Sequence, residues 1–341
     1  MLVKVGQNFG SFMNKVRFLT SGESHGKGLL GIIDGIPAGV TIDETYINFQ
    51  LKRRQDGTGR SNRMKLESDT VEIYGGVRKG KTIGAPIGMI INNVDYREVE
   101  KVTVPRPGHA DLAGMKKFWF DDIRNVSERA SARETAMRVA LCSVCMKVLE
   151  DIRVDISSKV DERYVMEAKS KKDTVGGLFE ITVENLPYGL GSYTHWDKKI
   201  NAELTKAVSS INGVKGVEIG MGFEMAEHFG SEVHDEIFED GNRLTNNAGG
   251  IEGGMTNAQP LIIRGIMKPI STLMKPLKSI DMETNKPVDA FKERSDTSVV
   301  TAASVIAEGM VSFVILDFIL EKFGGDSLEQ LMYHMKRTSR W

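Results

Sequence analysis

The sequence predicts an α+β fold built as one layered domain. The chain has 341 residues, of which 40% are hydrophobic and 27% are charged, so it can bury a substantial core. Segments with strand-like alternation and segments with helical spacing follow one another without the regular strand–helix–strand order of a doubly wound sheet. No internal repeat, low-complexity tract or linker divides the sequence.

Four segments have the spacing or end signals of helices. The first begins at Thr41, where T-I-D-E matches a capping box. A long helix is expected from about Ser127 to Asp151, because apolar residues recur there every three or four positions. Trp196–Ile211 also has helical spacing, and the last helix is expected from about Thr297 to a C-cap at Gly324.

Four short segments are predicted as strands. Gly177–Glu184 alternates between apolar and polar residues, as a half-buried strand does. Val71–Tyr74 and Ile87–Ile91 are separated by a glycine-rich connection, and Val214–Ile219 is a further candidate. The most apolar stretch, Val299–Leu320, contains two charged residues that would be costly in a bilayer, so we interpret it as a buried core helix.

The charge balance and the cysteine content exclude several classes of protein. Lys and Arg number 45 and Asp and Glu 46, a net charge of −1, which argues against a protein that coats nucleic acid or a polybasic membrane anchor. Two cysteines exclude a disulfide framework and favour a cytoplasmic location. The amino-terminal segment lacks the apolar stretch of a signal peptide. Cys142 and Cys145, within a predicted helix, are expected to be buried, unreactive thiols, and no metal site is predicted.

Two glycine-rich segments in the first third of the chain could contribute chemistry. G-E-S-H-G (22–26) places His25 on a tight turn, where an imidazole can transfer protons near neutral pH, although a lone loop histidine is often structural. K-R-R-Q-D-G-T-G-R-S-N-R-M-K (52–65) concentrates six cations that could bind phosphate or carboxylate. The alternatives are a solvated loop or a contact to a nucleic-acid backbone, but no aromatic residues are interleaved for base stacking.

Further candidates lie in the middle and at the end of the sequence. R-P-G-H-A-D (106–111) precedes Arg129 and Arg133, which would share a face at the start of the long helix and bind an anion, unless Glu128 and Glu134 pair with them. The carboxyl-terminal set is N-N-A-G-G-I-E-G-G-M-T (246–256), K-P-I-S-T (268–272) and E-R-S-D-T (293–297). Each of these is also compatible with ordinary turns and a helix cap.

Taken together, these motifs closely resemble the chorismate synthase family. The blocks are R-F-L-T-S-G-E-S-H-G, R-R-Q-x-G-T-G-R, R-P-G-H-A-D, R-A-S-A-R-E-T-A-M-R, I-N-G-V-K-G-V-E-I-G, N-N-A-G-G-I-E-G-G-M-T and R-S-D, in the family's order. The resemblance implies a single-domain β-α-β-α sandwich over residues 17–341, with 1–16 as an amino-terminal extension. It also implies a homotetramer and no nucleic-acid or membrane partner.

The resemblance implies a lyase that eliminates phosphate from 5-enolpyruvylshikimate 3-phosphate in the anti-1,4 sense to give chorismate, with reduced FMN. That reaction is the last common step of the shikimate pathway. His25 would protonate the departing phosphate, His109 would donate a proton toward flavin N1, and Asp296 would assist flavin N5 in removing the ring proton. The implied substrate contacts are Arg54, Arg60, Arg63, Arg106, Ser131 and Arg133. The implied flavin contacts are Arg129, Ala130, Ser131, Asn212, Gly213, Gly253, Lys268, Pro269, Ile270, Ser271, Thr272 and Arg294.

The sequence departs from the family pattern in small ways and leaves rival functions open. Ala130 stands where many relatives have serine and Gly213 where many have alanine, and the stretch between about 151 and 177 is short. An NADP-dependent flavin reductase is a rival, although no GxGxxG fingerprint follows a strand. A nucleic-acid-binding protein that uses the 52–65 loop is a second rival.

Overall fold

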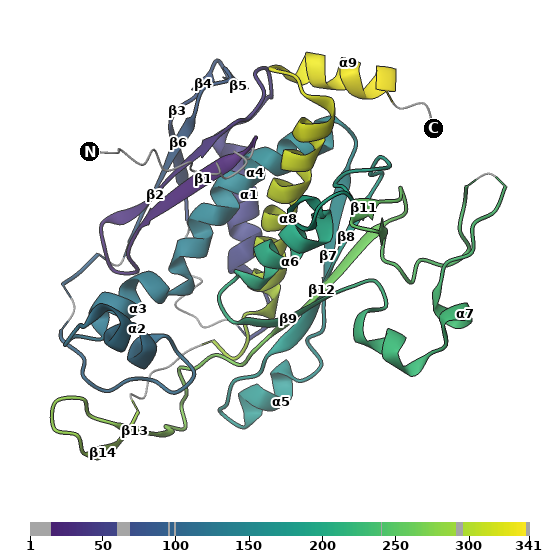
Figure 1. The fold of residues 1–341 in the computed structure, drawn as a ribbon. Coiled ribbons are helices and arrows are strands. Elements are labelled where there is room, and N and C mark those ends of the chain that lie inside the picture. The colour runs from purple at the N-terminus through teal and green to yellow at the C-terminus, as the bar shows by residue number, and fades with distance from the viewer. Residues whose placement is uncertain are drawn as a thin grey trace, which may run out of the picture.

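The computed structural model describes residues 15–59, 69–94, 96–98, 100–239, 241–290 and 296–338. Two four-stranded antiparallel sheets form its outer layers (Figure 1). The first sheet has the order β1 (Arg17–Gly22), β2 (Gly28–Asp34), β6 (Ile87–Asn92) and β3 (Val71–Gly75). The second has the order β7 (Asp155–Val160), β8 (Gly177–Glu184), β12 (Leu261–Met267) and β9 (Val214–Ile219). The predicted strands are confirmed, whereas β1, β2, β7 and β12 were not predicted.

Four helices fill the space between the sheets (Figure 1). They are α1 (Glu44–Gln55), α4 (Thr135–Asp151), α6 (Ile200–Ser209) and α8 (Val300–Phe323). Helix α4 packs on the first sheet, α8 packs on β7 and β8 of the second, and α4 and α8 contact each other. The layers therefore run sheet, helices, helices, sheet. This confirms the predicted α+β class, whereas the layer order differs from the β-α-β-α order that the resemblance implied.

Smaller elements surround this sandwich. Short hairpins are formed by β4 (Val77–Arg78) with β5 (Lys81–Thr82), β10 (Ile251–Glu252) with β11 (Met255–Thr256), and β13 (Lys278–Ile280) with β14 (Pro287–Asp289). The peripheral helices are α2 (Asp111–Phe118), α3 (Arg124–Ala130), α5 (Val165–Ser170), α7 (Gly230–Val233) and α9 (Leu328–Thr338). Turns of 3₁₀ helix span Ala132–Glu134, Trp196–Lys198 and Gly222–Glu227.

Two predicted helix starts are wrong. The N-cap of α1 is Asp43, whose carboxylate accepts from the Tyr46 backbone N–H at 2.9 Å, while Thr41 forms a β-bridge with Lys81. The long helix predicted from Ser127 is interrupted at Ser131, which has extended backbone dihedrals. The Ser131 hydroxyl accepts from the Arg133 N–H, so this residue ends α3 and caps the 3₁₀ turn before α4 begins.

Helix α8 is the core of the molecule, as the sequence predicted. Among the residues that the structure describes, it alone is long and apolar enough to cross a membrane, but 89% of its apolar stretch is buried in the protein. Both of its central charges have partners. Glu308, fully buried, accepts from Arg53 of α1 at 2.6 and 2.8 Å, and Asp317 accepts from the Val16 N–H at 2.8 Å. These two interactions fasten α1 and the start of β1 to the central helix.

Cys142 and Cys145 lie on α4 and are fully buried as free thiols. Burial raises the pKa of Cys142 to about 12 and that of Cys145 well above its usual value. Since the thiolate is the reactive form, the prediction that both are unreactive is consistent with their surroundings.

Gly265 provides a test of how the second sheet packs. It pairs with Phe179 across β12 and β8, and a Cβ at Gly265 would lie 2.3 Å from the buried Phe179 ring. Gly265→Ala should therefore lower the free energy of unfolding by about 1–3 kcal/mol, as overpacking does. Gly88→Ala, where the nearest atom to a new Cβ is 3.9 Å away, is the matched control in the first sheet. Equal thermal stability of the two variants would contradict this packing.

Candidate active site

The turn that carries His25 is held from two sides. Asn93, just after β6, donates its side-chain amide to the carbonyls of Glu23, Ser24 and Gly26 at 2.8–3.3 Å. On the other side, Glu128 of α3 bonds the His25 ring at Nδ1 at 2.9 Å and accepts from the His25 backbone N–H at 2.7 Å. The imidazole of His25 is therefore fixed in direction, with Nδ1 toward Glu128.

Two of the predicted substrate-binding arginines meet beside this turn. Arg133 donates to Asp69 at 2.6 Å and to the Asn93 side chain at 2.9 Å. Arg54, at the end of α1, is almost fully buried and lies 3.8 Å from the other oxygen of Asp69. It also donates to Thr135 and to the Ala132 carbonyl, which secures the 3₁₀ turn. Asp69 thus brings two guanidinium groups together.

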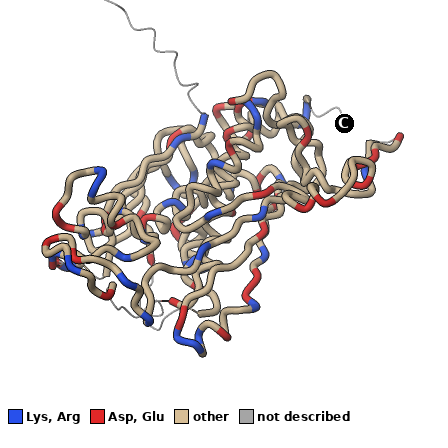
Figure 2. The backbone as a smooth tube through the Cα atoms, turned by 60° about the horizontal axis from the view of Figure 1, so that its bottom comes forward, with Lys and Arg blue, Asp and Glu red and all other residues tan. Residues whose placement is uncertain are grey.

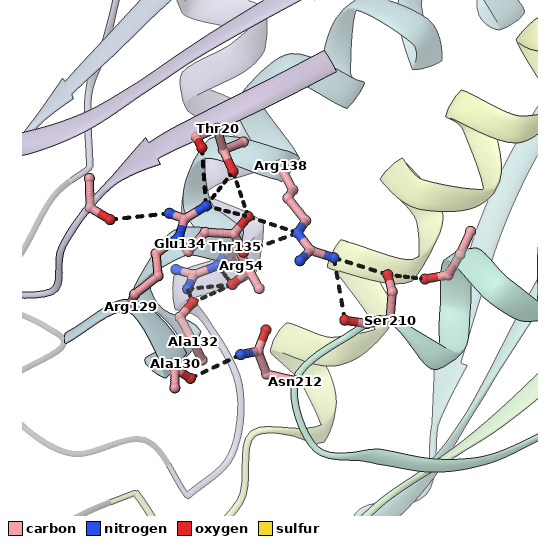
Figure 3. A network of polar contacts seen from close by, with 12 residues as sticks. Thr20, Arg54, Arg129, Ala130, Ala132, Glu134, Thr135, Arg138, Ser210 and Asn212 are labelled. Carbon is pink, nitrogen blue, oxygen red and sulfur yellow. Dashed lines mark hydrogen bonds and ion pairs between the residues drawn. The ribbon is translucent and has the colours of Figure 1, made fainter. Parts of the chain in front are cut away.

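Arg129 does not lie where the sequence predicted it. Because α3 ends at Ala130, Arg129 lies in a last helical turn and not at the positive end of a helix, and it shares no helix face with Arg133. It donates to the Gly22 carbonyl and to both oxygens of Thr20, and Thr20 donates to Glu134 (Figure 3). Glu134 accepts mainly from Arg138, with Arg129 3.9 Å away. The prediction that Arg129 and Arg133 share a face at a helix start is therefore wrong, and Arg129 secures the end of β1.

His109 belongs to a second charged cluster, formed within R-P-G-H-A-D. Its Nδ1 lies 2.5 Å from Oδ1 of Asp111, the first residue of α2, which is fully buried. Arg106 donates to both oxygens of Asp111 and lies 3.1 Å from the same nitrogen of His109. Burial alone would raise the pKa of Asp111, but the hydrogen bonds from His109 and Arg106 outweigh it and hold that pKa well below its usual value.

The segment after β12 connects to this second cluster. Lys268 donates its ammonium to the Gly108 carbonyl, and Arg106 approaches the Thr272 hydroxyl at 3.4 Å. Partial burial and the neighbouring Lys215 lower the pKa of Lys268. A hollow of about 420 Å³ opens beside Lys268 and Pro269. These groups favour an anionic ligand.

Asn212 and Gly213 join the two clusters. Asn212 donates its side-chain amide to the Ala130 carbonyl at 3.1 Å (Figure 3), and Gly213 accepts from the Lys268 N–H at 2.9 Å. Gly213 has a φ of +88°, and a Cβ there would lie 2.7 Å from Met267, so glycine suits this position. The Asn212 side-chain oxygen is buried and makes no hydrogen bond to the described residues. A buried acceptor in this position is suited to a polar ligand.

Gly253 lies apart from the two clusters, and Asp296 lies in the segment that leads into α8. Gly253 occupies the turn of the β10–β11 hairpin, next to Gly250, which packs on Pro260 and Leu261 where β12 begins. Lys268 follows the opposite end of the seven-residue strand β12, which is roughly 20 Å long. Within one chain, Gly253 therefore lies far from the other predicted flavin contacts. Asp296 immediately precedes Thr297, which hydrogen-bonds Gly59 and Val175. Arg60, Arg63 and Arg294 lie outside the described residues, as do residues 60–65 of the predicted 52–65 loop, whereas residues 52–55 belong to α1.

Four polar residues of the site were missed as site residues. Glu128 bonds the ring of His25, and Asp111 bonds the ring of His109. Arg133 is held by two of the missed residues, Asn93 and Asp69. The only local signal was the H-x-D spacing in R-P-G-H-A-D. Glu128, Asn93 and Asp69 act across 40 to 103 positions of sequence, where no short-range pattern exists.

Comparison with known proteins identifies the family. The chorismate synthase family model matches residues 16–163 and 159–320. The chain belongs to the chorismate synthase family. It is 49% identical to the chorismate synthase of Thermoanaerobacter pseudethanolicus and 46% identical to that of Streptococcus sanguinis, each alignment covering 93% of this chain and 96% of the relative. A solved crystal structure of a chorismate synthase matches with a TM-score of 0.76 and 38% identity, over 94% of this chain and 96% of that one.

The family predicted from the sequence is thereby confirmed, together with the reaction that defines it. Chorismate synthases are lyases that use reduced FMN to convert 5-enolpyruvylshikimate 3-phosphate into chorismate. The comparisons cover nearly all of the chain, so the match extends over both charged clusters described above.

The depressed pKa of Asp111 predicts a pH-dependent contribution to stability. The ionised carboxylate stabilises the fold fully above the unfolded pKa of about 3.9, and this contribution is lost as the pH falls toward the lower folded pKa. Asp111→Asn should therefore be less stable than the parent above about pH 4, by up to about 3–5 kcal/mol for a broken buried ion pair, and the difference should shrink on acidification. Thermal unfolding followed from pH 7 to pH 3 checks this. A difference that stays constant over that range would contradict it.

Proposed function

We propose that the two charged clusters form one active site, in which His25, His109 and Asp296 transfer protons during the family's elimination of phosphate. The observation that carries this proposal is a continuous series of contacts between segments far apart in sequence. It runs from His25 through Glu128 to Ala130, from there to Asn212 and Gly213, and on to Lys268, Gly108 and His109. Two imidazoles oriented by carboxylates and flanked by arginines suit the loss of an anionic leaving group.

The arginines account for binding of the substrate. 5-Enolpyruvylshikimate 3-phosphate carries one phosphate and two carboxylates, and guanidinium groups bind such oxyanions bidentately. Arg106 and Arg133 are fixed by Asp111 and Asp69, so their directions are set before a ligand arrives. Ser131 lies between the clusters and contacts the Ser24 hydroxyl at 3.3 Å. Arg60 and Arg63 stay predictions.

The residues present fit reduced FMN. The unsatisfied buried oxygen of Asn212, the cation of Lys268 and the hydroxyls of Ser271 and Thr272 offer polar contacts for a flavin and its phosphate. Arg129 is occupied by β1 carbonyls, so we assign the flavin contact of that segment to Ala130 and Ser131. When bound, reduced FMN supplies an electron that the substrate takes up and returns as phosphate leaves. Gly253 and Arg294 stay predictions.

In this proposal each protein group has a limited task. His25 holds a proton at Nε2 for the departing phosphate, and His109 holds one for the bound cofactor. Asp296, just before α8, accepts the ring proton with the help of the cofactor. The arginines bind the substrate anions and orient the ring.

The rival functions find no support in the described residues. Every strand pairing within both main sheets is antiparallel, so the described part of the chain offers no parallel βαβ unit for NADP. Basic and acidic residues are interspersed along the tube in Figure 2, which does not favour a nucleic-acid surface.

We also propose that the protein assembles as a homotetramer in the cytoplasm. Leu19, Leu30 and Ile32 expose an aliphatic outer face of the first sheet, with 74%, 46% and 43% of each residue exposed. The outer face of the second sheet also exposes Leu178 and Ile266, at 45% and 46%. Unlike the first face, it carries a charged group at its centre, Arg264 between Glu180 and Glu218. The first face suits burial against a second copy. The number four comes from the family, and the cytoplasmic location agrees with two reduced, buried cysteines.

The solution mass tests the assembly. Light scattering should give a multiple of the 37.7 kDa chain. Leu30→Glu should lower that mass because it places a charge on the aliphatic face. Thr182→Glu, on the outer face of the second sheet, should not change the mass. A monomeric parent protein would contradict the proposal.

An anaerobic assay tests the catalytic proposal. The full chain, supplied with photoreduced FMN and 5-enolpyruvylshikimate 3-phosphate, should yield chorismate and one phosphate per substrate. An FMN-replete, reduced sample that forms no chorismate would refute the proposal. Retention on RNA that weakens steeply with salt would favour the nucleic-acid rival. Consumption of NADPH when no other reductant is present would favour the flavin-reductase rival.

His109→Ala tests the second cluster within the same assay. The loss of a general acid should lower turnover by about 10²–10⁴-fold. The matched control is His334→Ala, because the His334 ring bonds the carbonyl of Phe323, the last residue of α8, and lies outside both clusters. Turnover close to that of the parent would remove His109 from the mechanism.

A further inference from the structure

A single carboxylate binds His25 at two points. One oxygen of Glu128 lies 2.9 Å from the ring nitrogen Nδ1, and the other accepts from the His25 backbone N–H at 2.7 Å. The side chains are 19% exposed for His25 and 14% for Glu128, so water competes little for these bonds. Both the imidazole and the backbone that carries it are therefore fixed by one side chain.

The helix that carries Glu128 is itself tied to the same turn. The Glu128 carbonyl accepts from the Ser24 N–H at 3.1 Å, and Ser131 at the end of α3 contacts the Ser24 hydroxyl. Asn93 holds the opposite side of the turn through three carbonyls. With both sides secured, the position of the Glu128 carboxylate sets the position of the His25 ring.

Glu128 has no competing partner among the neighbouring arginines. The sequence left open that Glu128 pairs with Arg129 or Arg133, but neither stands at the three- or four-residue spacing of a helix pair. Arg129 donates to Thr20 and Gly22, and Arg133 donates to Asp69 and Asn93. Arg124, four positions before Glu128 on α3, donates to the Glu100 carbonyl at 3.3 Å. The carboxylate of Glu128 bonds His25 instead.

We propose that Glu128 is the positioning residue of His25, setting both its tautomer and the direction of its proton transfer. A carboxylate at Nδ1 keeps the hydrogen on that nitrogen, so Nε2 is the atom that takes up or releases a proton. The negative charge also stabilises the imidazolium from which a proton can pass to a leaving phosphate. This inference rests on the proposed role of His25.

The second cluster has the same design. Asp111 lies 2.5 Å from Nδ1 of His109, and its carboxylate is fully buried. Two histidines from separate segments thus each have an acidic residue at Nδ1, one from α3 and one from α2. A carboxylate at Nδ1 also occurs at exposed His195, 2.6 Å from Asp197, so the choice of ring nitrogen alone does not mark a proton carrier. The proposal for Glu128 rests on the low exposure of its pair with His25 and on its two contacts to that residue.

Glu128→Gln provides the kinetic test in the full-length, FMN-loaded enzyme. Glutamine keeps the shape, but it offers one oxygen and one NH₂ to two N–H groups, so one of the two bonds is lost. We expect kcat to fall by about 10²-fold while KM for the substrate changes by less than about threefold, because the residue acts through His25. Glu329→Gln, at an exposed position on α9 outside both clusters, is the control and should keep parental kcat. A Glu128→Gln enzyme with parental kcat would overturn the proposal.

The tautomer itself is measured without turnover. In full-length protein with ¹⁵N-labelled histidine, the His25 signal, assigned by its loss in His25→Ala, should show hydrogen on Nδ1 at neutral to basic pH. In Glu128→Gln the hydrogen should redistribute toward Nε2. If the His25 ring of the parent protein carries its hydrogen on Nε2, the inference is overturned. This outcome does not depend on whether Glu128→Gln folds.

The two measurements also separate this inference from the proposed function. Suppose that His25→Ala keeps parental turnover while the ring carries its hydrogen on Nδ1. The catalytic role of His25 then fails, and with it the role of Glu128 in proton transfer, although the pairing stands. Suppose instead that His25→Ala loses turnover while Glu128→Gln does not. Then His25 keeps its role and only the inference about Glu128 is wrong.

Discussion

The packing of α4 against α8 is the contact on which the rest of the molecule depends. Each sheet packs an apolar face against these helices, and both helices are buried almost all round, so neither layer is stable without the other. The helices approach closely where Gly309 faces Cys142: a Cβ at Gly309 would lie 3.0 Å from the Cys142 Cβ. Glycine therefore sets the distance between the two central layers. A larger side chain there would push α4 and α8 apart.

The same central helices position the site. Glu308 on α8 binds Arg53, which fixes the end of α1, and Arg54 follows directly with its guanidinium turned toward Thr135 at the start of α4. Removing one partner of a buried ion pair costs about 3–5 kcal/mol, so this link is expensive to break. The core thus determines where Arg54, the first of the predicted substrate-binding arginines, lies.

The interruption at Ser131 shows how far local sequence could predict the site. The segment Ala130–Ala136 has good helix formers and apolar spacing, so a continuous helix was the natural prediction. The helix instead stops because Glu128, Arg129 and Arg133 each bond a different distant segment: the His25 turn, β1 and Asp69. These bonds join positions 64 to 109 residues apart, and no window of local sequence contains both partners. Similarly, β2 was missed because G-L-L-G-I-I-D has no strict alternation.

The sequence by itself determined the α+β class, the strands at Gly177–Glu184 and Val214–Ile219, the buried helix that ends at Gly324, and the family. Those features depend on periodicity, caps and motifs, which are local. Only the tertiary structure decided which groups share a site: that Glu128 orients His25 rather than an arginine, that Arg129 secures β1, and that Gly253 lies at the far end of β12. The physical reason is that a hydrogen bond depends on distance in space, and folding alone brings these distant positions within 3 Å of one another.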